Sequence, residues 1–292
     1  MTGERVLISF DYALKRMLRN KSNYDVLEGF LSELLMTDIS VKNLGESEGN
    51  KEHVTDKSNR VDILVEDSVG ELMLIELQFN IELDYLHRML YGTSKAITER
   101  MFHGMEYAEV KKIYSINIVY FNLGKGEDYV YHGKTHFTGL HTKDELRLSD
   151  QQREVFGKET AGDIYPEYYI LKVNNFDDNT KDHLDEWIYF FKHNTVKEEF
   201  QAKGLDKARE VLDRDKLTPE ERKAYDAERW ERSHRVSEIA SAKAEGREEG
   251  KKEGREEREK LTQELEKERK EREEREKELL AEIARLKQNK QQ

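Results

Sequence analysis

The sequence predicts an α/β domain of about 200 residues followed by a highly charged helical extension. Two β-type runs, Arg60–Glu66 and Glu71–Phe79, lie between segments whose apolar residues have helical spacing. A third β-type run, Ile113–Phe121, contains no Pro or Gly, and shorter β-type runs follow it. Beyond Lys203 the chain reads as helix with few breaks. We therefore assign residues 1–200 to the domain and residues 201–292 to the extension.

The expected helices follow from the spacing of apolar residues. From Phe10 to Met36 these residues recur at three- and four-residue intervals, which predicts two helical stretches that part near positions 20–23. A helix is expected from Leu83 to His103 and should end there, because Gly104 follows. An amphipathic helix is expected over Asp182–His193. Shorter strands are expected at Tyr129–His132, His136–Leu140 and Tyr168–Val173.

The composition limits the classes of function. Charged residues make up 38% of the 292 residues, against about 25% in typical domains, and the net charge is −12. Such an acidic chain has no bulk attraction to nucleic acid, so DNA binding requires a local basic patch or a metal ion. The chain has no Cys, which excludes disulfides, thiolate zinc sites and Cys nucleophiles. Without a signal-peptide pattern or an apolar run of about 18 residues, we expect a cytoplasmic protein.

The segment from Arg60 to Phe79 predicts a β-hairpin with a defined register. A three-residue loop at 68–70 places Gly70 where the backbone requires a positive φ. Pairing is then symmetric about position 69, so that Asp62 lies opposite Glu76, with Gln78 on the same face. The other face of the hairpin is wholly apolar, with residues Val61, Ile63, Val65, Met73, Ile75, Leu77 and Phe79.

Two carboxylates this close repel each other, so one must be protonated or a cation must lie between them. A divalent metal ion such as Mg²⁺ suits this position, because it prefers oxygen ligands from one or two carboxylates and from substrate phosphates. Alternatively, Asp62 and Glu76 lie at an exposed end of the sheet and pair with Arg60 or Lys57. Three histidines lie close enough in sequence to suggest a zinc site, but without a nearby Cys or a helical His-Glu-x-x-His motif we expect surface or core positions for them: His132, His136 and His141.

The hairpin resembles the active-site hairpin of the PD-(D/E)XK nuclease superfamily, in its variant with Gln in place of the terminal Lys. Further segments resemble the Rpn family of recombination-promoting nucleases, often labelled transposases, and the resemblance runs from about Phe10 to Glu257. The matching motifs include Asp11-Tyr-Ala-Leu-Lys15, Arg88-Met-Leu-Tyr91, Lys95, Gly104-Met-Glu-Tyr107, Ile116-Asn117-Ile118 and Trp187-Ile-Tyr-Phe-Phe-Lys192. The resemblance implies a restriction-endonuclease-like mixed sheet flanked by helices.

The resemblance also implies Mg²⁺-dependent (or other divalent-cation-dependent) hydrolysis of phosphodiester bonds in double-stranded DNA. Asp62, Glu76 and the Leu77 carbonyl would hold the metal ion, which lowers the pKa of the attacking water. Gln78 would orient groups only through hydrogen bonds, because it lacks the positive charge of a Lys. Lys15 would supply the missing cation, unless it is simply an exposed residue beside other basic residues.

Arg88 and Glu33 are two further candidates for the site. Arg88, in the helix after the hairpin, would contact a DNA phosphate. Glu33, at the edge of the apolar face of the first helical region, would add a third carboxylate.

The extension offers weak signals for self-association. Glycines recur every four residues at 246, 250 and 254, which would permit close helix packing, although a solvated, charged helix explains them as well. Leu279, Ile283 and Leu286 have coiled-coil spacing over one or two heptads only. The extension would thus support a homo-oligomer. The rival functional class is a catalytically inactive module with a nuclease-like core that binds DNA or protein and assembles through this helix.

Overall fold

The computed structural model of the chain describes residues 24–45, 63–101, 104–213 and 216–289. The chain divides into two compact units, Met1–Tyr225 and Asp226–Gln292. The first predicted helical stretch and the beginning of the first predicted strand, at positions 60–62, lie outside the described residues. Within the described ranges, no helix combines the length and the apolarity that crossing a membrane requires.

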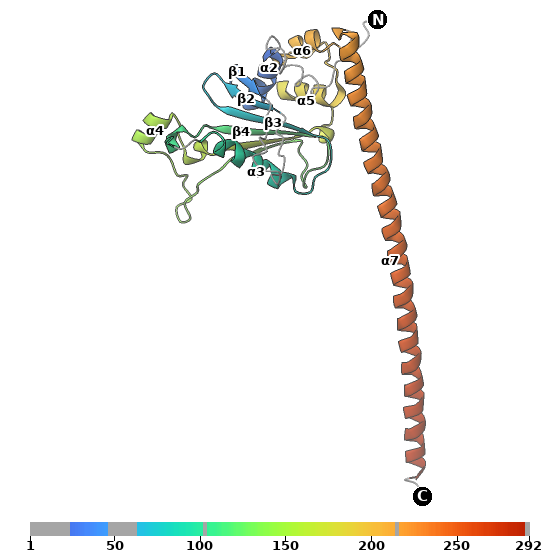
Figure 1. The fold of residues 1–292 in the computed structure, drawn as a ribbon. Helices are drawn as coiled ribbons and strands as arrows, with labels where there is room; N and C mark the ends of the chain where they lie inside the picture. Colours follow the sequence, from blue (N-terminus) through green and yellow to red (C-terminus); the bar gives the residue numbers. More distant parts are fainter. Residues whose placement is uncertain (1–23, 46–62, 102–103, 214–215, 290–292) are drawn as a thin grey trace. The chain divides into compact units, whose positions relative to one another are not determined.

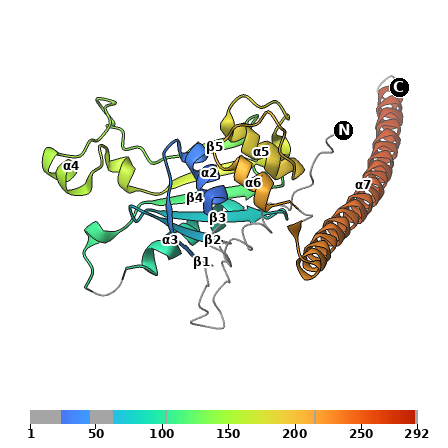
Figure 2. The same cartoon turned by 90° about the horizontal axis from the view of Figure 1, so that it is seen from above.

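In the described part of the first unit, six strands form one mixed sheet with the order β1-β2-β3-β4-β6-β5 (Figures 1 and 2). β1, β2 and β3 are antiparallel neighbours, β3, β4 and β6 run parallel, and β5 returns antiparallel to β6. The strands are β1 (Val41–Gly45), β2 (Ile63–Asp67), β3 (Leu72–Gln78), β4 (Ile113–Val119), β5 (Val130–Gly133) and β6 (Glu167–Lys172).

Helices cover both faces of this sheet (Figures 1 and 2). α2, α5 and α6 lie over one face and α3 lies over the other, which confirms the predicted α/β fold with a mixed sheet flanked by helices. The helices are α2 (Tyr24–Leu35), α3 (Tyr85–Thr98), α4 (Asp150–Phe156), α5 (His183–His193), α6 (Leu205–Val211) and α7 (Pro219–Asn289). Short 3₁₀ turns occupy Tyr107–Glu109, Ala161–Ile164 and Val173–Asn175.

The main hydrophobic core lies between the sheet and the helices α2, α5 and α6. Phe30 of α2 is fully buried, and its ring centroid lies 4.9 Å from that of Phe191 and 5.7 Å from that of Trp187. The sheet contributes the face that the sequence predicts to be apolar, including Ile63, Val65, Met73, Ile75 and Leu77. Because hydrophobic side chains fill this face, the polar residues of the hairpin lie on the opposite face, toward α3.

α6 belongs to this core although it follows position 200. Leu205, Ala208 and Leu212 are almost fully buried in the same cluster, and so is Tyr225 at the beginning of α7. These apolar contacts extend past the domain boundary near residue 200 that the sequence suggests, and that boundary stays a prediction.

One predicted strand is wrong. His136–Leu140 has alternating polarity, but Thr138 forms only an isolated bridge with Glu145, because a tight turn at 139–144 takes up the neighbouring main-chain groups. The structure also adds β1 and α4, which the sequence analysis did not predict. β1 is a short edge strand with little apolar patterning, and the short helix α4 buries no residue.

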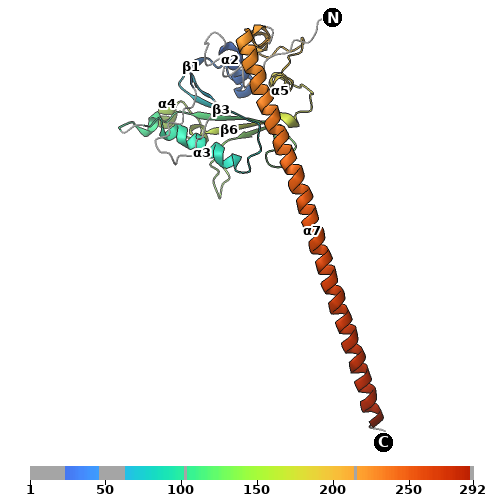
Figure 3. The same cartoon turned by 45° about the vertical axis from the view of Figure 1, so that its right-hand side comes forward.

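α7 is a single continuous helix, as Figure 3 shows. It begins with a capping box, in which the Thr218 hydroxyl accepts from the Glu221 N–H while the Glu221 carboxylate accepts from the Thr218 N–H, and Pro219 occupies the first turn. Between Lys243 and Ala281, every residue whose exposure the structure describes is exposed except Gly254, which is half-buried. A Cβ added at 246, 250 or 254 would meet no atom within 4 Å. This part of α7 is therefore a solvated helix in the described chain.

We expect that a protein ending near Ala242 keeps the melting temperature of the full chain, because the removed helix buries no apolar area in the described structure. Differential scanning calorimetry checks this expectation, and a large drop in melting temperature would contradict it. Light scattering on both proteins tests the homo-oligomer, because the measured molar mass divided by the mass of one chain gives the number of chains per particle. A number that falls on truncation supports assembly through α7, and an unchanged number argues against it.

Candidate active site

The β2–β3 hairpin has the register that the sequence predicts. Ile63 faces Ile75, and Gly70 adopts a φ of +85° in the turn. One pair further along, this register puts Glu76 opposite position 62, whose aspartate lies outside the described residues. The geometry of the Asp62–Glu76 pair therefore stays a prediction, while the confirmed register supports it.

Glu76 is a buried carboxylate on the face of the sheet that α3 covers. The residue is 5% exposed, and the residue paired with it on the adjacent strand β4 is Asn117, which is 1% exposed. Ser115, two residues before Asn117, lies on the same face and borders the same narrow cavity of about 10 Å³. A charge in such a place is stable only with a cationic partner or after protonation.

Arg88 of α3 provides this positive charge. Its Nη2 lies 2.5 Å from Oε1 of Glu76, and its Nη1 donates to both oxygens of Glu82, at 2.8 Å and 3.0 Å. One guanidinium thus connects two carboxylates. The sequence suggested Arg88 as a phosphate ligand, and in this structure it forms ion pairs within the site.

Gln78 joins the same group of side chains. Its Nε2 donates to Oε1 of Glu82 at 2.7 Å and to the carbonyl of Asn80 at 3.2 Å. Glu76, Arg88, Glu82 and Gln78 therefore form a continuous chain of polar contacts, which we call the hairpin network. Sequence analysis missed Glu82; the available signal was its position four residues after Gln78, between the strand and the helix that carry the other members.

Tyr85 holds the first turn of α3 on the sheet and so positions Arg88 one turn later. The Tyr85 side chain is fully buried, and its hydroxyl donates to Oδ1 of Asn117 at 3.1 Å. The Asn117 amide in turn donates to the Ser115 hydroxyl at 3.0 Å. These contacts tie α3 to β4 beside Glu76, which limits how far Arg88 can move without disturbing the helix.

The electrostatics of the hairpin network favour the charged form of Arg88. Burial alone would lower the pKa of the guanidinium, but the carboxylates of Glu76 and Glu82 outweigh burial and raise the pKa. Arg88 is therefore a permanent cation next to Glu76, and any metal ion that binds Glu76 must compete with it.

The donor chemistry at this end of β3 fits a hard divalent cation, because a carboxylate, an amide oxygen and main-chain carbonyls are available. The Gln78 carbonyl accepts from the Tyr120 N–H on the β4 side, so the Leu77 carbonyl points to the β2 side. In the described part of the chain, no three His, Asp or Glu side chains converge in a metal-binding cluster. A metal ion at Glu76 would therefore need Asp62, main-chain oxygen or substrate oxygens.

The other suggested residues are placed as follows. Lys15 lies outside the described residues. Glu33 does not join Glu76: it lies on α2, over the opposite face of the sheet, and accepts from the Lys203 N–H at 3.0 Å. The suggestion of Glu33 as a third carboxylate is therefore wrong, because the sheet separates the two side chains.

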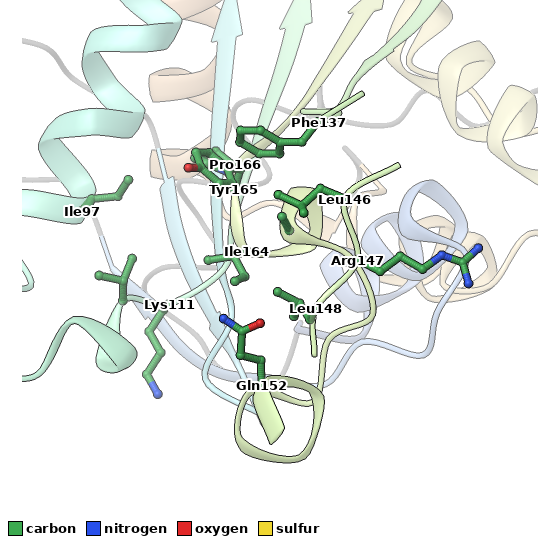
Figure 4. Close-up of a pocket in the computed structure, with 12 residues that line it drawn as sticks. Ile97, Lys111, Phe137, Leu146, Arg147, Leu148, Gln152, Ile164, Tyr165 and Pro166 are labelled. Atoms are coloured by element: carbon green, nitrogen blue, oxygen red, sulfur yellow. The ribbon is translucent and has the colours of Figure 1, made fainter. Parts of the chain in front are cut away.

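Figure 4 shows a larger cavity, of about 590 Å³, between the end of α3 and the segment that carries α4. The described residues that line it include no carboxylate and no histidine, so they lack the side chains that most often bind a catalytic metal ion. The lining residues are Ile97, Val110, Lys111, Phe137, Leu146, Arg147, Leu148, Gln152, Ala161, Ile164, Tyr165 and Pro166. The hairpin network is therefore the stronger candidate for the active site.

A comparison with protein families agrees with this choice. A family model described as PD-(D/E)XK nuclease family transposase matches residues 8–242, which include the hairpin, α3 and the hairpin network. The chain belongs to this PD-(D/E)XK nuclease family. No curated protein and no solved structure shows a significant match.

Membership of the PD-(D/E)XK family confirms the resemblance seen in the sequence. It indicates a nuclease or transposase-related function and implies a DNA substrate. Nucleases of this kind typically use divalent cations, which agrees with the oxygen donors around Glu76.

Proposed function

We propose that this PD-(D/E)XK protein is a metal-dependent DNA endonuclease that hydrolyses phosphodiester bonds in recombination, in defence or in the movement of mobile elements. The observation that carries the proposal is Glu76, a carboxylate that is 5% exposed at the hairpin position where the sequence resemblance implies a metal ligand. A buried carboxylate in a polar setting, paired with a cation, is typical of a functional site.

Each residue has a defined task in the proposed reaction. Asp62, Glu76 and the Leu77 carbonyl hold a divalent cation, expected to be Mg²⁺. The cation, when bound, stabilises charge on the phosphate and lowers the pKa of the attacking water. Gln78 orients the water or a phosphate oxygen through hydrogen bonds, since it can donate and accept but carries no charge. Lys15 and Arg88 supply positive charge to the phosphate.

Supercoiled plasmid DNA incubated with the purified protein tests the proposal. We expect nicked or linear product with Mg²⁺ or Mn²⁺ and none with EDTA. Retarded but uncut plasmid under all metal conditions would contradict the proposal and favour a module that only binds DNA.

DNA affinity is expected to be weak and to depend on the metal ion. With a net charge of −12 the chain has few basic contacts to offer, so the plot of log K against log salt concentration should have a shallow slope. Fluorescence anisotropy with a labelled duplex in Ca²⁺ measures this slope. A slope as steep as for about eight phosphate contacts would contradict the expectation and indicate a basic groove.

A further inference from the structure

Glu82 occupies a central place in the hairpin network. It lies in the short segment between β3 and α3, and its side chain is 31% exposed. Both of its oxygens accept from Nη1 of Arg88, at 2.8 Å and 3.0 Å, and Oε1 also accepts from Nε2 of Gln78 at 2.7 Å. Glu82 thus contacts two residues of the proposed site, on two different elements.

The contacts with Glu82 and with the Asn80 carbonyl determine how the Gln78 amide is oriented. A carboxylate only accepts hydrogen bonds, so the Nε2 side of the amide must face Glu82. The amide oxygen of Gln78 therefore points away from Glu82, where it can accept a hydrogen bond from water. Without Glu82 the amide would lose the shorter of these two contacts, at 2.7 Å, and keep the contact with the Asn80 carbonyl at 3.2 Å.

Glu82 also forms an ion pair with Arg88 that is separate from the ion pair between Arg88 and Glu76. The guanidinium uses Nη2 for Glu76 and Nη1 for Glu82, so the two ion pairs are made by different nitrogens. A cation that binds Glu76 would displace the Nη2 contact. The Nη1 contact with Glu82 would then keep Arg88 beside the site instead of releasing it to solvent.

We propose that Glu82 is a positioning residue, which holds Arg88 and Gln78 in place while a divalent cation takes over Glu76. This inference rests on the proposed metal-dependent function. It predicts that the effect of Glu82 on metal binding is exerted through Arg88, because without the Glu82 carboxylate more of the Arg88 charge would act on Glu76 and compete with the cation.

Calorimetric titration of the full-length protein with Mn²⁺, without DNA, tests this proposal as a double-mutant cycle. Glu82→Ala should weaken Mn²⁺ binding by about tenfold, a size common for coupled neighbours. In an Arg88→Ala background, the same Glu82→Ala substitution should have little effect. Asp84→Asn is the matched control, because its exposed side chain makes no capping bond, and its Mn²⁺ affinity should equal that of the unchanged protein.

Each outcome of the cycle has one meaning. Equal weakening by Glu82→Ala in both backgrounds would overturn the proposal, because Glu82 would then act on the metal ion directly and not through Arg88. Unchanged affinity in Glu82→Ala would overturn it as well, while leaving the proposed function intact. No Mn²⁺ binding by the unchanged protein would defeat the proposed function and this inference together. Circular dichroism and the melting temperature show whether each variant is folded.

Discussion

Replacing Glu76 with Gln should lower the rate of plasmid cleavage by about three orders of magnitude. The substitution keeps the size of the side chain but removes the negative charge that would hold the metal ion. Metal-ion catalysis contributes several kcal/mol to stabilisation of the transition state, and about 1.4 kcal/mol corresponds to a tenfold change in rate. Single-turnover cleavage of supercoiled plasmid with Mg²⁺ in excess measures the loss.

Glu66→Gln is the matched control for this experiment. Glu66 belongs to the same hairpin, near its turn, and pairs with Lys42 at 2.8 Å instead of with Arg88. Its replacement should leave cleavage unchanged. In Glu76→Gln, Arg88 retains Glu82 as a partner, so the fold should persist with a modest loss of stability. Cleavage by Glu76→Gln at the unchanged rate would place the active site elsewhere.

Replacing Gly29 with Ala should destabilise the first unit by about 2–3 kcal/mol, the cost typical of forcing extra volume into a packed core. A Cβ at position 29 would lie 2.2 Å from the Lys203 carbonyl oxygen and 2.6 Å from the Gly204 Cα. Main-chain atoms cannot move aside as a flexible side chain can, and Gly204 has a φ of +82° that already constrains this turn. The melting temperature should therefore fall by roughly 5–10 °C.

Gly45→Ala is the comparison for Gly29→Ala, because a Cβ at position 45 would meet no atom within 4 Å. Its effect should stay below about 0.5 kcal/mol. Thermal melts of both variants by circular dichroism provide the comparison. An unchanged melting temperature for Gly29→Ala would mean that the segment before α6 does not pack on α2, which contradicts the core described here.

The hairpin could be predicted from the sequence because local rules determine it. A turn that needs a positive φ at Gly70 sets the loop length, and the loop length then determines which residues face each other. The apolar residues at alternate positions identify the buried face. These rules also put Glu76 and Gln78 on the face opposite the apolar one, and the structure shows that α3 covers this face (Figure 1).

Other features depend on contacts that local patterns do not encode. His136–Leu140 alternates in polarity like a strand, but a strand also needs a neighbour whose main-chain groups are available. The helix α4 did carry signals, the Ser149–Gln152 capping box and Gly157 with a φ of +62°. The sequence carries no specific signal for Glu82, because the role of this residue arises only when α3 folds back onto the sheet and brings Arg88 beside it.

Anomalous diffraction from a crystal soaked in Mn²⁺ tests the central claim most directly. The account predicts a peak within bonding distance, about 2–2.5 Å, of a Glu76 carboxylate oxygen, on the side of β3 that faces position 62. Nη2 of Arg88 should then have left Glu76, while its Nη1 stays with Glu82. A peak that lies elsewhere in the protein, or no peak at Glu76 at saturating Mn²⁺, would contradict the account.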